Sequence, residues 1–232
     1  VAGGLWTNSL ALLADAGHML SDVAALGLSL FALWLAERPP NARRTYGYYR
    51  TEILAALANG AALVAVAILI LIEAYQRARH PPEVLGAAMM AIAFGGLVVN
   101  LLSLAILSSS RHSNLNLRGA WLHVLSDSLG SVGAIVAGLL IWAFGWRWAD
   151  PAISALIGLL IVYSSWRLLS ESVSVLMESA PRGIDVDAVR DTLSGVPGVL
   201  EVHDLHVWTI TSGMDSLSAH VVVPDGHPVS PL

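Results

Sequence analysis

The stretch SLALLADAGHMLSDVAALGLSLFALWLA, residues 9–36, is long and apolar enough to cross a membrane as one helix, yet it carries ionisable side chains near its middle. His18 and Asp22 are four residues apart, so they project from the same face of a helix, one turn apart. Ionisable side chains at membrane depth are costly and usually mark a functional pathway. The stretch therefore predicts a membrane helix that contributes to a site.

The same pattern occurs a second time, because HVLSD at 123–127 repeats HMLSD at 18–22 inside another apolar run. His123 and Asp127 form a second pair on one helix face. Two such helices packed face to face would bring two imidazoles and two carboxylates together, which is typical of a tetrahedral zinc site. Asp15 shares the face of His18, and we expect it to line the pathway or cap a helix rather than bind the metal.

The composition places the whole chain in the membrane class. Of its 232 residues 56% are hydrophobic and 12% are charged, and the mean hydropathy of +0.68 lies outside the range of a soluble globular domain. Cysteine is absent, which excludes disulfides and thiolate metal sites. Acids outnumber arginines most strongly in residues 178–232, so we expect no nucleic acid partner.

Five apolar spans are expected, at about residues 9–36, 51–75, 84–107, 119–144 and 151–169, the last without an acidic residue. We expect residues 1–177 to form a transmembrane domain in the lipid bilayer and residues 178–232 a cytoplasmic domain. The arginine-rich loop 37–50 is expected on the cytoplasmic side, and the arginines of the other loops favour a cytoplasmic C-terminus. The cell (inner) membrane is the expected location.

After residue 177 the composition changes to that of a small α/β domain. Residues 184–193 predict an amphipathic helix with acids in its first turn. The runs 199–211 and 216–223 alternate enough to predict two strands. Because one helix and two strands bury little core, we expect the domain to be truncated. Residues 1–6 read as the end of an apolar segment whose beginning is missing.

Four motifs taken together resemble the cation diffusion facilitator family of zinc transporters. They are SLALLADAGH at 9–18 running into Asp22, YGYYRTEIL at 46–54, the second His/Asp pair, and VHDLHVW at 202–208. The resemblance implies six transmembrane helices, cytoplasmic termini, a homodimer, and a ferredoxin-like cytoplasmic domain of order αββαβ. The first helix of the family and the last αβ unit are then expected to be absent from this sequence.

The resemblance also assigns residues. It implies a transport site of His18, Asp22, His123 and Asp127, the same four residues that the spacing indicates. It implies a further metal site in the cytoplasmic domain at His203 and His220, with later ligands beyond residue 232. The Zn²⁺ bound there would be structural or regulatory.

Two further expectations rest on the family pattern at the loop that enters the third family helix. Some members have metal ligands there, but this loop offers only Tyr48, so we expect no metal site in it. A basic residue at the start of that helix pairs in the family with an acid at the entrance to the cytoplasmic domain. In this sequence the resemblance points to Arg50 and Glu178, and the alternative is that Arg50 only anchors its helix at the lipid headgroups.

The expected function is therefore export of Zn²⁺, or of other divalent transition metals, in exchange for protons, and not catalysis. A metal-binding His must be neutral and a carboxylate ionised, so protons and zinc compete for the same side chains. The alternative is an intramembrane zinc-dependent hydrolase, although the sequence has no His-Glu-x-x-His pattern or nucleophile motif. A passive channel for divalent cations predicts oxygen-rich coordination, against which the two His argue.

Overall fold

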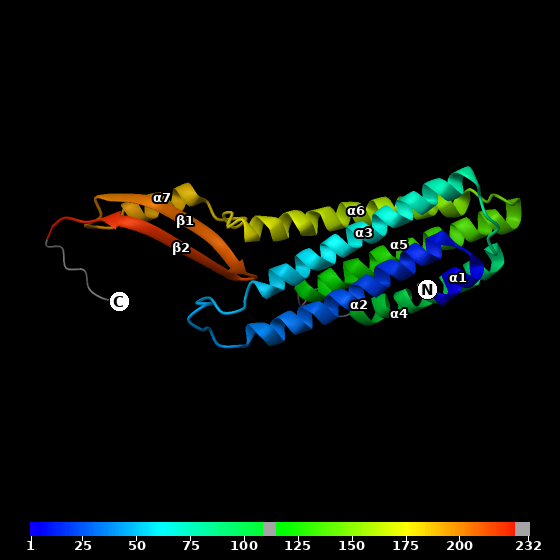
Figure 1. Cartoon of the computed structure of the whole chain (residues 1–232), viewed down its shortest axis with the longest axis horizontal. Helices are drawn as coiled ribbons and strands as arrows, with labels where there is room; N and C mark the ends of the chain where they lie inside the picture. The colour runs from blue at the N-terminus through cyan, green and yellow to red at the C-terminus, as the bar shows by residue number, and fades with distance from the viewer. Residues whose placement is uncertain (109–114, 226–232) are drawn as a thin grey trace. The chain divides into compact units, whose positions relative to one another are not determined.

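The computed structural model describes the backbone of residues 1–108 and 115–225 (Figure 1). Five of the helices in these ranges are long and apolar enough to cross a membrane, which confirms the expected number of spans. In chain order the elements are α1 (Ala2–Thr7), α2 (Leu10–Ala36), α3 (Thr51–Arg79), α4 (Gly86–Ser108), α5 (Leu115–Phe144), α6 (Ala149–Leu176), α7 (Val186–Ser194), β1 (Glu201–Thr211) and β2 (Met214–Val222).

The long helices extend beyond the apolar runs from which they were predicted. Helix α3 continues to Arg79, and α6 runs from Ala149 to Leu176. A helix can continue past its apolar run, because charged and aromatic side chains are well placed at the membrane surface. Residues 151–169 contain no acidic residue, as expected, but α6 begins before them and includes Asp150 in its first turn.

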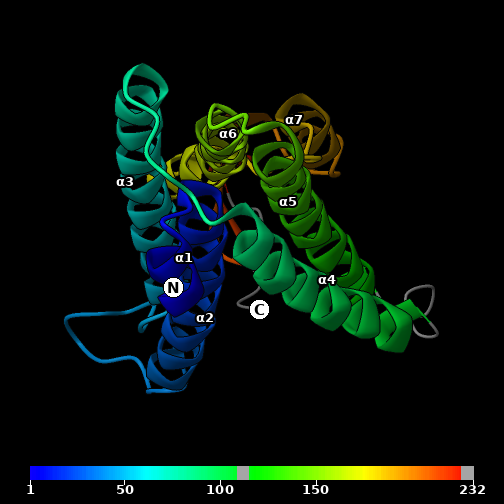
Figure 2. The same ribbon diagram turned by 90° about the vertical axis from the view of Figure 1, so that its right-hand side faces the viewer.

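The backbone packs into two compact units, Val1–Ala25 with Asn59–Arg167, and Leu26–Ala58 with Leu168–Leu232. In the first unit, α4 and α5 lie side by side (Figure 2). Their contact is dominated by small side chains, which let helix backbones approach each other in a membrane. The buried cluster around this contact also includes residues of α2 and α6, and it comprises Ala11, Leu12, Met89, Ala93, Ala134, Ala137, Ile141 and Ala149.

Two glycines mark the closest approach of α4 and α5. A Cβ added to Gly86 would lie 2.8 Å from the carbonyl oxygen of Gly138. A Cβ added to Gly138 would lie 2.7 Å from Met90 Cγ and 2.9 Å from the carbonyl oxygen of Gly86. Only glycine allows the two backbones to pack at this distance.

Along the five long helices many large apolar side chains are exposed, including Leu20, Phe31, Phe94, Leu129 and Trp166. In a chain with five apolar spans these faces are suited to contact lipid, because hydrocarbon replaces water as the surrounding medium. The fold is that of a multi-pass membrane protein.

The second unit contains the small α/β domain that the sequence predicts. Helix α7 is capped by Asp185, whose carboxylate accepts the backbone N–H groups of Asp187 and Ala188, and it packs against β1. Strands β1 and β2 form an antiparallel pair, in which Val207 lies opposite Leu217. The register shifts between His203 and His206, so β1 contains a bulge there. The order helix, strand, strand is confirmed, and β2 begins two residues earlier than expected.

Candidate metal centre

Helices α2 and α5 bring the two His/Asp pairs of the sequence together. His18 Nε2 lies 3.8 Å from the Asp22 carboxylate and 3.7 Å from the Asp127 carboxylate. His123 Nε2 lies 3.4 Å from Asp22 and 3.6 Å from Asp127. The ligand atoms of His18, Asp22 and Asp127 are all within 4.8 Å of one another. Each imidazole therefore lies next to the carboxylate of its own helix and that of the facing helix.

These distances fit a tetrahedral ion. Zinc binds nitrogen and oxygen at about 2.0 to 2.2 Å, so neighbouring ligand atoms in a tetrahedron are about 3.3 to 3.5 Å apart. The four nitrogen–oxygen distances, 3.4 to 3.8 Å, exceed this edge by a few tenths of an ångström at most. The two rings are tilted at 58°, with centroids 6.1 Å apart, so they do not stack on each other. His18, Asp22 and Asp127 thus already have the spacing of metal ligands, and His123, which is not part of that group of three, lies beside both carboxylates.

The four side chains are partly accessible rather than sealed. The exposed fraction is 13% for Asp127 and 49% for His123. A cavity of about 420 Å³ reaches the site and is lined by Asp15, His18 and Asp127, together with residues of α6. His18 contacts the carboxylates through Nε2. Its other ring nitrogen, Nδ1, has no hydrogen-bond partner among the residues that the structure describes. An ion can thus reach the site without unfolding a helix.

The predicted residues of the cytoplasmic domain also come together. His203 and His220 are cross-strand partners on β1 and β2, with ring centroids 5.3 Å apart. The carboxylate of Asp204 lies 3.3 Å from His203 Nδ1 and 3.2 Å from His220 Nδ1. All three side chains are exposed, and their ligand atoms lie within 4.8 Å of one another. They form a second cluster that could hold a metal ion.

Asp204 was missed in the sequence because neighbouring residues of a regular strand point to opposite faces. Here the bulge and the left-handed backbone of Asp204, with φ 49°, turn its side chain toward His203. The only signal in the sequence is that Asp204 follows His203 in VHDLHVW, and this adjacency does not indicate a bulge.

The expected ion pair at the start of α3 is confirmed. An Arg50 guanidinium nitrogen donates to Glu178 Oε1 at 2.7 Å. Two residues later, the carboxylate of Glu52 accepts hydrogen bonds from the hydroxyls of Thr211 and Ser212 at the end of β1. The start of α3 is therefore linked to the linker after α6 and to the hairpin of the α/β domain.

Comparison with known proteins agrees with this architecture. The family model of the cation efflux transmembrane domain matches residues 1–177, and that of the cytoplasmic domain of cation efflux proteins matches residues 181–230. The cadmium, cobalt and zinc/H(+)-K(+) antiporter of Bacillus subtilis is 50% identical over 225 residues, which are 96% of this chain and 72% of that protein.

Two further relatives are similarly close. The metal cation efflux system protein CzcD of Cupriavidus metallidurans is 48% identical over 222 residues, covering 96% of this chain and 70% of the relative. The zinc transporter ZitB of Escherichia coli is 48% identical over 230 residues, covering 98% and 74%.

Fold and comparisons together define a membrane transport protein rather than an enzyme, as expected from the sequence. The chain belongs to the cation efflux family, the cation diffusion facilitators that its motifs resemble. It is a metal cation efflux transporter with several membrane spans. This assignment disfavours the alternative of an intramembrane hydrolase.

Proposed function

We propose that this protein exports Zn²⁺ from the cytoplasm in exchange for protons, and that His18, Asp22, His123 and Asp127 bind the ion during transport. The observation that carries the proposal is the arrangement of these four ligands, with nitrogen–oxygen distances of 3.4 to 3.8 Å between two membrane helices. The names of the relatives, a zinc transporter and a cadmium, cobalt and zinc antiporter, support zinc as cargo.

The chemistry of the ligands supplies the exchange. Zinc requires neutral imidazoles and ionised carboxylates, so each ion that binds displaces protons from the site, and each proton that returns weakens the hold on the ion. Apparent zinc affinity therefore falls as the pH falls. A neutral cytoplasm loads the site with metal, and an acidic outer face unloads it. Alternating access would open the site first to one side and then to the other.

The donor set also limits the cargo. Two nitrogens and two oxygens without sulfur suit Zn²⁺, and also Co²⁺, better than the oxygen-preferring Mg²⁺ and Ca²⁺. We include Cd²⁺ and Co²⁺ as secondary cargo because a relative's name contains them. The side chain of Asp15, which lines the same cavity, would line the path of the ion.

The remaining assignments follow the family. We propose a homodimer in the cell (inner) membrane with the α/β domain in the cytoplasm, where the cluster of His203, Asp204 and His220 binds a structural or regulatory Zn²⁺. Membership of the cation efflux family, whose cytoplasmic-domain model matches residues 181–230, supports this arrangement.

The test is zinc flux into proteoliposomes with and without an imposed pH gradient. We expect uptake that increases with the gradient, and loss of uptake in Asp22→Ala and Asp127→Ala, because three ligands hold zinc poorly against protons. Glu83→Gln is the matched control, because this carboxylate is 85% exposed and lies outside the site. Zinc flux that is independent of the pH gradient would exclude proton exchange. Parental flux in both alanine variants would exclude the assigned transport site.

A further inference from the structure

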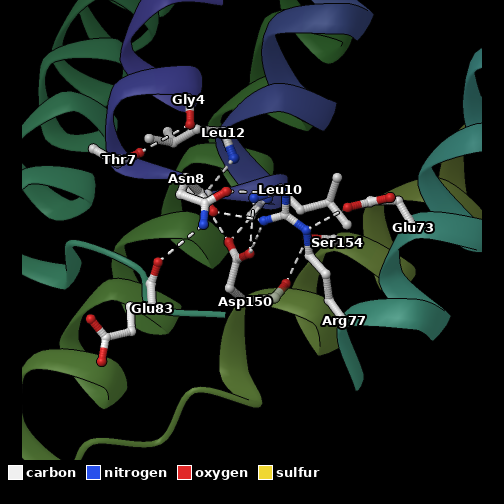
Figure 3. A network of polar contacts seen from close by, with 12 residues as sticks. Gly4, Thr7, Asn8, Leu10, Leu12, Glu73, Arg77, Glu83, Asp150 and Ser154 are labelled. Atoms are coloured by element: carbon white, nitrogen blue, oxygen red, sulfur yellow. Dashed lines mark hydrogen bonds and ion pairs between the residues drawn. The ribbon is translucent and has the colours of Figure 1, made fainter. Parts of the chain in front are cut away.

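A buried carboxylate that takes no part in metal binding lies at the start of two helices at once. Asp150 belongs to the first turn of α6 and is fully buried. It accepts the backbone N–H group of Leu10 at 2.9 Å (Figure 3). It also accepts the Ser9 hydroxyl at 2.6 Å and the backbone N–H group of Ala11 at 3.1 Å. These are the first groups of α2, which have no partner within their own helix. A residue 140 positions away in sequence therefore caps α2.

Arg77, in the last turn of α3, completes this network. Its guanidinium lies 4.0 Å from the Asp150 carboxylate and donates to the carbonyl oxygen of Asn8 at 2.7 Å (Figure 3). It also donates to Glu73 at 2.8 Å. Asn8 lies between α1 and α2 in a left-handed conformation, with φ 56°. The corner that leads into α2 is thus held from α3 and from α6.

The rest of the packing shows why this corner matters for α2. In its first five residues, Leu10, Ala11, Leu12 and Ala14 are buried. From Asp15 to Ala25, a segment described throughout, none is buried. Within this unit, α2 is therefore fixed mainly at its N-terminal end, while the segment with His18 and Asp22 extends from that end.

We propose that Asp150 is a positioning residue for the transport site: by capping α2, its carboxylate fixes the direction and rotation of the helix that carries His18 and Asp22. This inference rests on the proposed function of the His/Asp site.

The expected sensitivity follows from helix geometry. At about 1.5 Å per residue, His18 lies about 12 Å and Asp22 about 18 Å along the helix from Leu10. A change of about 5° in the direction of α2 at the cap would move these residues by roughly 1 and 1.6 Å. Metal-ligand distances tolerate only about 0.2 Å. A small change in helix direction at the cap would therefore displace the ligand atoms by more than metal binding tolerates.

The test is zinc binding to the purified full chain, measured as affinity and as the visible spectrum of bound Co²⁺, which reports tetrahedral coordination. Asp150→Asn keeps the size of the side chain but removes its charge, and we expect about tenfold weaker zinc binding with weaker tetrahedral bands, as for other changes in the supporting shell of a metal site. Ser9→Ala removes one of the three hydrogen bonds to Asp150, together with the bond that the Leu12 N–H donates to the Ser9 hydroxyl at 3.2 Å, and a loss of about threefold is expected.

Ser154→Ala is the matched control. The Ser154 hydroxyl is fully buried and donates to the backbone carbonyl of Asp150, so its loss disturbs α6 without removing a bond to α2. We expect parental zinc affinity and an unchanged Co²⁺ spectrum in this variant, even if its unfolding temperature falls.

The outcomes separate the two proposals. If Asp22→Ala binds as much zinc as the parent, the proposed transport site is wrong. If the parent binds zinc there but folded Asp150→Asn and Ser9→Ala bind it equally well with the same Co²⁺ spectrum, the positioning role is wrong and the cap is merely structural. If Asp150→Asn does not fold, Ser9→Ala decides the question.

Discussion

The close approach of α4 and α5 leads to a quantitative prediction for Gly138→Ala. The added methyl group would lie 2.7 Å from Met90 Cγ and 2.9 Å from the carbonyl oxygen of Gly86. Ordinary contacts between carbon and a carbonyl oxygen begin near 3.3 Å, so the methyl overlaps a backbone atom that cannot move without shifting a helix. Overpacking of this kind costs about 1 to 3 kcal/mol.

A smaller opposing effect comes from the unfolded chain, because replacing glycine by alanine stabilises by about 0.4 to 1 kcal/mol where the backbone allows it. We therefore expect Gly138→Ala to lower the free energy of unfolding by about 1 to 2 kcal/mol. For a protein of this size that corresponds to an unfolding temperature lower by roughly 2 to 8 °C. Gly86→Ala, whose Cβ would lie 2.8 Å from the carbonyl oxygen of Gly138, is expected to behave alike.

The assay is thermal unfolding of the purified protein in detergent, and α4 offers a matched control. Apart from the adjoining residues and backbone of α4 itself, no described atom lies within 4 Å of the position of a Cβ on Gly95, so Gly95→Ala is expected to keep or slightly raise the unfolding temperature. The packing argument is refuted if Gly138→Ala and Gly86→Ala unfold with the parent, or if Gly95→Ala loses as much as they do.

Three further predictions concern the charged and metal-binding residues. His18→Asp is expected to broaden selectivity toward Cd²⁺ or Mn²⁺, because replacing an imidazole nitrogen by oxygen removes the nitrogen preference that favours zinc; competition assays in vesicles check this, and unchanged zinc preference contradicts it. Arg50→Glu and Glu178→Arg should each impair transport or dimer stability, and their combination should recover part of the loss; the pairing is wrong if the double variant is no better than the worse single one. Because the pair is exposed, we expect it to contribute at most about 1 kcal/mol. Asp204→Ala is expected to weaken zinc binding by the cluster of His203, Asp204 and His220 about tenfold, which a zinc titration in a background lacking the membrane site would show. Vesicle transport by Asp204→Ala with the membrane site intact is expected to persist, and unchanged affinity of the cluster would contradict the prediction.

The parts of the site that the sequence predicts are those set by local geometry. A spacing of four places His18 and Asp22 on one helix face whatever surrounds the helix, and the same holds for His123 and Asp127. Their convergence could be expected because two identical pairs of polar groups in apolar helices gain by facing each other. The five spans were predictable for the same reason, since each depends on the length of one apolar run.

What the sequence could not predict depends on contacts between distant residues or on irregular backbone. Asp150 precedes Pro151 and reads as a residue outside the span, whereas its partners Ser9 and Leu10 lie 141 and 140 positions earlier in the chain. No periodicity connects them. Asp204 reaches His203 and His220 only because a bulge turns the strand, and bulges carry no spacing signal.

The cap on α2 also limits where insertions and deletions can be tolerated in the chain. Since the helix starts at a fixed carboxylate, a residue inserted between Leu10 and His18 would rotate both ligands by about 100° and advance them by about 1.5 Å. A deletion would do the same in the opposite sense. Loop 37–50, which connects α2 to α3, has no such constraint on its length. Viable length variants of this protein should therefore occur in loops of this kind and be absent from the interval between the cap and the site.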